Sequence, residues 1–153
     1  MSTVPIKRHP SLKPLSRQHH HSLLLCWKIR EGLNRNIELT RIKNYTDWFW
    51  DTHLNQHFTL EEQAAFSILS PEDADLVRAR TDRKRLRSLF EDNQNIASSL
   101  RLLEKELEAH IRFEERVLFN KIQDTATPEQ LKNLNTIHIP DFQDIWKDKF
   151  WEE

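Results

Sequence analysis

Apolar side chains recur along most of the chain at alternating steps of three and four residues, the spacing that places them on one face of an α-helix. The clearest stripe reads Leu100, Leu103, Leu107, His110, Glu114 and Val117. An earlier one reads Leu76, Ala79, Arg83, Leu86, Phe90 and Asn93. Because Arg83, His110 and Glu114 share these stripes with apolar residues, we expect their side chains to point into the core.

Helix start and stop signals divide the pattern into four long helices, predicted at 16–36, 40–69, 71–95 and 96–125. Ser16 and Thr40 are the expected N-caps of the first two helices. The third is expected to begin at Ser70-Pro71-Glu72-Asp73, a capping serine followed by proline and acids that complement the helix dipole. Thr127-Pro128-Glu129 predicts a short fifth helix.

The two ends of the chain differ in character. Pro5, Pro10 and Pro14 predict an extended arm over residues 1–15. The last residues are aromatic, and we expect Ile145, Trp146 and Phe150 to lie across the bundle or an opening of it.

We therefore predict an all-α fold, an up-down antiparallel four-helix bundle with a short C-terminal helix and an aromatic tail. A length of 153 residues fits one domain over 1–153, with the arm at 1–15, the bundle at 16–125 and the C-terminal helix and tail at 127–153. The single glycine, Gly32, excludes phosphate-cradling loops and dinucleotide-binding turns.

Charge and cysteine content limit the partners and the compartment. The 23 basic and 24 acidic residues nearly cancel to a net charge of −1, so we expect neither nucleic acid nor a membrane surface as a partner. Cys26 is the only cysteine, which excludes an internal disulfide and fits a reducing compartment. Because the first residues contain no apolar run, we expect no signal peptide and a cytoplasmic protein.

A repeated motif carries the candidate chemistry. His57-Phe-Thr-Leu-Glu61-Glu62 returns later in the chain as His110-Ile-Arg-Phe-Glu114-Glu115. A His and a Glu four residues apart project from the same side of a helix. Two such helices would direct both pairs at one point, a nitrogen and oxygen set that suits iron, manganese or zinc. One such pair alone would carry little weight, because it arises by chance on many helices.

With these motifs the chain resembles the hemerythrin-like family, the HHE cation-binding domains built on an up-down four-helix bundle around a non-heme iron pair. The resemblance covers residues 15–122. Leu15-Ser-Arg-Gln-His19 is similar to the family's Leu-x-x-Glu-His in the first helix, which favours His19 as a ligand and leaves His20 as the alternative. The metal ligands implied in this way are His19 or His20, His57, Glu61, His110 and Glu114, with Glu115 as the alternative to Glu114.

The third helix departs from the family, which places two histidine ligands there. This chain has Ala79 and Arg83 at those positions. Half of the usual two-metal site is therefore missing, and we expect one iron ion or an asymmetric pair, with zinc or manganese as alternatives. Glu62 and Glu115 are expected either to hold the ligating histidines from outside or to be solvated.

Two functions follow from these expectations. The first is a metal-binding protein that senses dioxygen or nitric oxide or handles iron, as members of the family do. The second is a metal-free regulatory or interaction module in which Arg83 neutralises the core glutamates. No serine, cysteine or threonine lies in a recognisable nucleophile setting, which argues against an enzyme.

Overall fold

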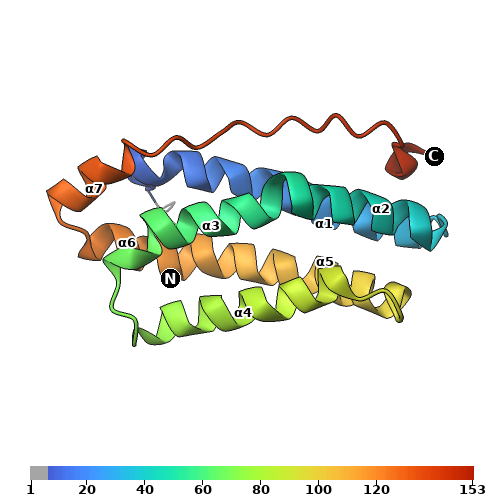
Figure 1. The fold of residues 1–153 in the computed structure, drawn as a ribbon, viewed down its shortest axis with the longest axis horizontal. Helices are drawn as coiled ribbons and strands as arrows, with labels where there is room; N and C mark the ends of the chain where they lie inside the picture. The colour runs from blue at the N-terminus through green and yellow to red at the C-terminus, as the bar shows by residue number, and fades with distance from the viewer. Residues whose placement is uncertain (1–6) are drawn as a thin grey trace.

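The computed structural model describes residues 7–153, and every regular element in this range is helical (Figure 1). The α-helices are α1 (Lys13–Asn34), α2 (Leu39–Phe49), α3 (Asn55–Ala64), α4 (Ala74–Glu91), α5 (Ile96–Phe113), α6 (Phe119–Thr125) and α7 (Pro128–Leu134). The longer helices lie along the long axis of the molecule, and α5 packs against both α1 and α4. The predicted all-α fold is thereby confirmed for the described residues.

Two of the predicted helices each contain a π-helical segment. Trp50–Leu54 connects α2 to α3, and Glu114–Leu118 connects α5 to α6. A π turn inserts an extra residue and rotates everything beyond it about the helix axis. For this reason Val117, which the uninterrupted periodicity placed in the core, is 40% exposed, and Leu118 is buried instead.

The first helix begins earlier than its sequence signals indicated. A 3-10 turn, Pro10–Leu12, leads directly into α1, so residues 10–15 are helical and the predicted extended arm is wrong there. Proline is compatible with the first turn of a helix, where its missing N–H would have no partner. Burial of Leu12 and Leu15 stabilises this extra turn. Pro5, the other proline of the predicted arm, lies outside the described residues.

The predicted caps are also corrected. Ser16 lies inside α1, and Thr40 lies inside α2, so neither caps a helix. The cap of α4 is Asp73, whose carboxylate accepts from the N–H groups of Asp75 and Leu76. Because α4 ends at Glu91, Asn93 is not part of its stripe. The predicted short fifth helix is present as α7, with Thr127 and Gln130 forming a capping box.

The apolar core consists of two clusters with a polar layer between them. One cluster contains Leu25 and Leu103 among its members, and the other contains Leu15 and Phe119. Helices α1, α3, α4 and α5 each contribute side chains to both clusters. On α1, for example, His19 comes between Leu15 and Leu25.

The C-terminal segment runs along the outside of the helices as an irregular trace that ends in a 3-10 turn, Phe150–Glu152 (Figure 1). Phe150 is fully buried, whereas Ile145, which was predicted to cover the bundle, is 72% exposed. Gly32 makes the Phe150 contact possible, because a Cβ at this position would lie 2.8 Å from both Phe150 and Ile42. The aromatic tail is therefore packed at its end.

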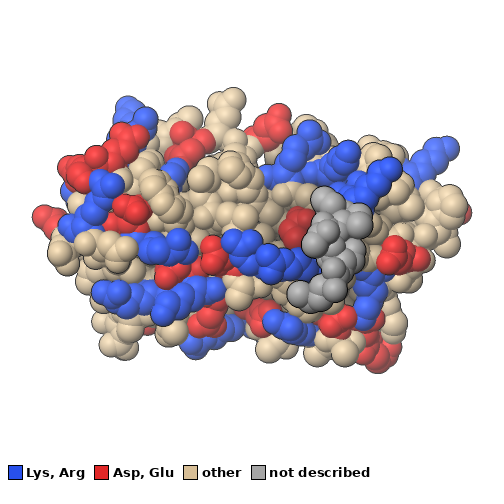
Figure 2. All heavy atoms as spheres, turned by 180° about the vertical axis from the view of Figure 1, so that it is seen from behind, with Lys and Arg blue, Asp and Glu red and all other residues tan. Residues whose placement is uncertain are grey.

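The surface of the molecule carries mixed charge. On the face shown in Figure 2, basic and acidic side chains are interspersed among the other residues. This face therefore does not present a field of one sign. None of the helices within residues 7–153 has an apolar stretch long enough to cross a bilayer.

The helical register is testable with two neighbouring leucines of α5. Leu103 is fully buried and Leu102 is 41% exposed. We expect Leu103→Ala to lower the free energy of unfolding by about 2 to 5 kcal/mol, through lost burial and the cavity left behind. Leu102→Ala should change it by less than about 0.5 kcal/mol. Urea unfolding followed by circular dichroism measures both, and equal effects would contradict the assigned register.

Candidate metal centre

The polar layer is built from side chains that different helices direct toward one another. His19 comes from α1, His57 and Glu61 from α3, and His110 from α5, and Glu114 is the first residue of the π segment after α5. All of these side chains are buried. Both His-x-x-x-Glu motifs therefore point inward, as their spacing predicted.

Four of these residues converge on one point. His19, His57, Glu61 and Glu114 each offer a ligand atom, and these atoms all lie within 4.8 Å of one another. The Nε2 atom of His19 is 3.3 Å from Glu61 Oε2 and 3.2 Å from Glu114 Oε2. The Nε2 atom of His57 is 3.1 Å from Glu61 Oε1. His110 is adjacent, with its Nε2 atom 2.5 Å from Glu114 Oε1.

The Nδ1 atom of each histidine contacts a side chain outside the group of converging donors. The Nδ1 atom of His19 is 2.6 Å from Glu115 Oε1, and that of His57 is 2.6 Å from Gln18 Oε1. The Nδ1 atom of His110 lies 3.4 Å from Asp82 Oδ2. In these contacts Nδ1–H donates to an oxygen, which leaves Nε2 free to ligate. Glu115 thus orients His19, and Glu114 is the acid that enters the cluster.

The closest contacts among the donor atoms fit one ion, whereas the group as a whole extends to 4.8 Å. Histidine nitrogens and carboxylate oxygens bind zinc at about 2.0 to 2.2 Å, so neighbouring donors around one ion are about 3 Å apart. The distances of 3.1 to 3.3 Å among His19, His57 and the two glutamates match this value. The 2.5 Å contact between His110 and Glu114 is shorter, so His110 reaches the cluster through Glu114.

Several atoms of the cluster lack a hydrogen bond. The Nε2 atoms of His57 and His110 and both carboxylate oxygens of Glu114 are buried without a hydrogen-bond partner within residues 7–153. Their nearest charged neighbours lie within ion-pair distance, with His57 Nε2 3.1 Å from Glu61 Oε1 and His110 Nε2 2.5 Å from Glu114 Oε1. Buried polar atoms are almost always paired, so an unpaired group of this kind indicates a ligand or an ion. The donor set therefore fits a bound metal.

Arg83 of α4 supplies a positive charge to the same layer. It is 8% exposed, and its guanidinium forms an ion pair with Glu61 and lies 3.8 Å from Glu114 Oε1. Its Nη1 also donates to the Phe58 carbonyl at 3.2 Å. The ring of Phe66 packs 4.1 Å from its central carbon. The structure thus places Arg83 in the core, as its position on the apolar stripe predicted.

The electrostatics of the cluster favour charged side chains in spite of burial. Burial opposes protonation of His19, but Glu114, Glu115 and Glu61 raise its pKa well above the usual value. Burial also opposes the charge on His110, but Glu114 and Asp82 raise its pKa to about 9. For Glu61, burial is outweighed by His57 and Arg83, which hold its pKa well below the usual value.

Other candidate residues lie outside the cluster. His20 is exposed, with its ring 5.8 Å from that of His21, so it is not beside the other proposed ligands. His53 is buried, with its ring 6.1 Å from that of His57. Burial, followed by the nearby His57 and His21, lowers the pKa of His53 to about 4. Glu62 pairs with Arg80 at 2.9 Å and does not hold a histidine.

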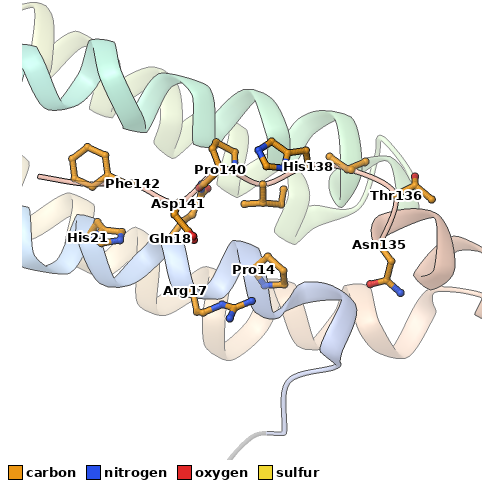
Figure 3. A pocket seen from close by; sticks show the side chains of 12 residues that line it. Pro14, Arg17, Gln18, His21, Asn135, Thr136, His138, Pro140, Asp141 and Phe142 are labelled. Carbon is orange, nitrogen blue, oxygen red and sulfur yellow. The ribbon is translucent and has the colours of Figure 1, made fainter.

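Sequence reasoning missed the roles of Gln18 and Asp82. Gln18 lies between His57 and the C-terminal segment, where its Nε2 donates to the Pro140 carbonyl at 2.9 Å (Figure 3). The motif that identified His19 includes Gln18, in the place of the family's glutamate, and this was the only signal for it. Asp82 had no signal, because only the packing of α4 against α5 brings it to His110.

Comparisons with known protein families, with curated proteins and with solved structures found no match to this chain. The resemblance to the hemerythrin-like family therefore rests on the sequence motifs alone.

The metal-free protein should lose stability as the pH rises above neutrality. Histidine in the unfolded chain titrates near 6.5, whereas the folded pKa of His110 is about 9 and that of His19 is also raised. The stability that these two protonated histidines contribute to the folded protein is complete below pH 6.5 and disappears as the pH rises through their folded pKa values. In the presence of a chelator we expect a lower Tm at pH 9 than at pH 7, measured by calorimetry.

The exposed His138 provides a matched control for this pH dependence. His110→Gln should make the decrease in Tm between pH 7 and pH 9 smaller, and His138→Gln should leave it unchanged. The same decrease in both variants would show that His110 is not charged in the folded protein.

Proposed function

We propose that this chain is a hemerythrin-like metal-binding protein that holds one non-heme iron ion through His19, His57, Glu61 and Glu114. The observation that carries the proposal is the convergence of four buried donors within 4.8 Å. The histidines are oriented from outside as metal ligands commonly are. The packing of α5 against α1 and α4 supports an up-down antiparallel four-helix bundle as the scaffold.

A single ion is proposed because Arg83 takes the place of a second one. The family resemblance puts two further ligands on the third helix, where this chain has Ala79 and Arg83. The Arg83 guanidinium is paired with Glu61 and lies 3.8 Å from Glu114 Oε1, so it already supplies positive charge to both acids. A permanent cation at this distance repels a second metal ion.

The donor set also limits the choice of metal and role. Two imidazoles with two carboxylates suit iron, manganese or zinc better than calcium or magnesium. Bound iron would supply a coordination position for dioxygen or nitric oxide. At a non-heme site of the hemerythrin type, reversible dioxygen carriage requires two irons that share electrons, so we propose sensing of such a ligand or iron handling as the role of a one-metal site.

A metal-free regulatory or interaction module is the second candidate function. The observation that favours it is the ion pair between Arg83 and Glu61, in which a buried arginine neutralises a buried acid without any metal. In this case the protonated histidines would complete the charge balance of the layer. The two candidates differ in whether a metal ion replaces those protons.

Metal analysis of the purified protein separates the two functions. After growth in iron-supplemented medium and purification without chelator, we expect about one equivalent of metal per chain, measured by plasma mass spectrometry. His57→Ala should lose the metal, because it removes a ligand, and His20→Ala should retain it. Less than about a tenth of an equivalent of iron, manganese and zinc combined would contradict metal binding and favour the metal-free module.

Arg83→His tests the role of the buried arginine. The substitution removes a competing positive charge and adds an imidazole, so we expect the affinity for iron(II) to increase. In metal-free buffer the same variant should be destabilised by about 3 to 5 kcal/mol, because Glu61 loses its ion-pair partner. Titration calorimetry and urea unfolding measure the two effects.

Arg80→His is the control, because Arg80 pairs with Glu62 outside the cluster. It should change neither the iron(II) affinity nor the metal-free stability by a comparable amount. If Arg83→His behaved like Arg80→His in both measurements, the proposed role of Arg83 would be wrong.

A further inference from the structure

A cavity lies on the outer side of Arg83, between α3 and α4. Its volume is about 350 Å³, within the range of small-molecule sites. Trp50 and Phe58 contribute aromatic side chains to its lining, and Arg80, Arg83, Lys84 and Arg87 contribute positive charge. Of the basic residues only Arg83 is buried, so the cavity connects the surface with the polar layer.

The charge of this cavity is strongly unbalanced. Four basic side chains line it, and Glu62 is the single acid among the lining residues. Glu62 is already paired, with its two carboxylate oxygens 3.0 and 2.9 Å from the guanidinium nitrogens of Arg80. Lys84 has no ion-pair partner in the described part of the chain. Arg83 is paired with Glu61 and Arg87 with Glu91, so Lys84 carries the unpaired positive charge that favours an anionic ligand.

Arg83 provides an unused hydrogen-bond donor at this cavity. Its Nη1 donates to the Phe58 carbonyl and to Glu62, and its Nη2 donates to Glu61, but its buried Nε–H has no acceptor within residues 7–153. A buried N–H without an acceptor lowers stability, and a ligand oxygen would remove that cost. A carboxylate is the matching acceptor, because it takes charge-assisted hydrogen bonds from arginine.

The rest of the lining suits an aromatic body. The rings of Trp50 and Phe58 meet edge to face, with centroids 6.0 Å apart. Trp50 is only partly buried, so part of its surface remains available to a ligand. Aromatic rings of this kind contact planar apolar molecules through offset or edge-to-face packing. A polar anion such as phosphate would leave these walls unused.

We propose that this cavity binds a small aromatic carboxylate, with its carboxylate on Arg83 and Lys84 and its ring against Trp50 and Phe58. A cavity beside Lys43 is lined by the acids Asp47, Asp51 and Glu91, which disfavour an anion. The cavity between α1 and the C-terminal segment has Phe142 as its only aromatic side chain apart from its histidines (Figure 3). It therefore lacks the aromatic pair. The proposal does not depend on metal binding, since Arg83 lines the cavity whether or not an ion is bound.

Titration calorimetry with 1-naphthoate, in the presence of a chelator, tests this proposal. We expect saturable binding of one molecule per chain, and binding of the neutral 1-naphthylmethanol that is at least about tenfold weaker. The double variant Lys84→Ala, Arg87→Ala should weaken naphthoate binding by a similar factor. Arg85→Ala is the matched control, because Arg85 lies on the same helix, is exposed, and pairs with Glu106 away from the cavity.

The Nε–H resonance of Arg83 reports on the contact directly. We expect naphthoate to shift this resonance and to slow its exchange with water, because the N–H gains an acceptor. Circular dichroism and Tm establish that each variant is folded before it is titrated. Absence of saturable binding, equal binding of the neutral alcohol, or equal losses in the double variant and Arg85→Ala would each overturn the proposal.

Discussion

The structure depends on the burial of two carboxylates in a helical core. Glu61 and Glu114 are both fully buried, and an ionised carboxylate is strongly disfavoured away from water. The fold must therefore bring positive charge or protons to this layer. Arg83 supplies one fixed charge, and the raised pKa values of His19 and His110 supply protons. The helices are arranged so that all of these groups meet.

The position of this layer between apolar clusters strengthens the electrostatic interactions within it. It lies between two apolar clusters, so the charges interact through a medium of low polarity. The surrounding contacts also restrict movement, since Gln18 holds His57 and Glu115 holds His19. The Gln18 contact extends to the C-terminal segment at Pro140, which connects the outer segment of the chain to the cluster.

Sequence reasoning succeeded where a residue and its role belong to the same helix. The inward direction of His110, Glu114 and Arg83 followed from their positions on apolar stripes, and each side chain is buried as expected. It failed at Val117, because periodicity assumes a continuous α-helix and the π segment changes the register there. It also failed at the N-terminal arm, where proline indicated an extended chain but occupies the first turns of a helix.

The groups that only packing brings together were beyond the sequence. Gln18 and His57 are separated by 39 residues and Asp82 and His110 by 28, so no local spacing reports their contacts. Such outer partners decide which ring nitrogen of each histidine faces the cluster. For that reason the residues of the cluster were predictable from one sequence, whereas the orientation of the histidine rings was not.

Charge balance explains why this layer is suited to exchange a metal ion for protons. Glu61 and Glu114 carry two negative charges when ionised, and Arg83 compensates only one of them. The remaining charge is met in the metal-free protein by protonation of His19 or His110, whose pKa values are raised by these same acids. A divalent ion would supply positive charge in place of those protons and would displace them. Arg83 of α4 thus leaves room for fewer cations in the layer, but the two glutamates still require one further positive charge.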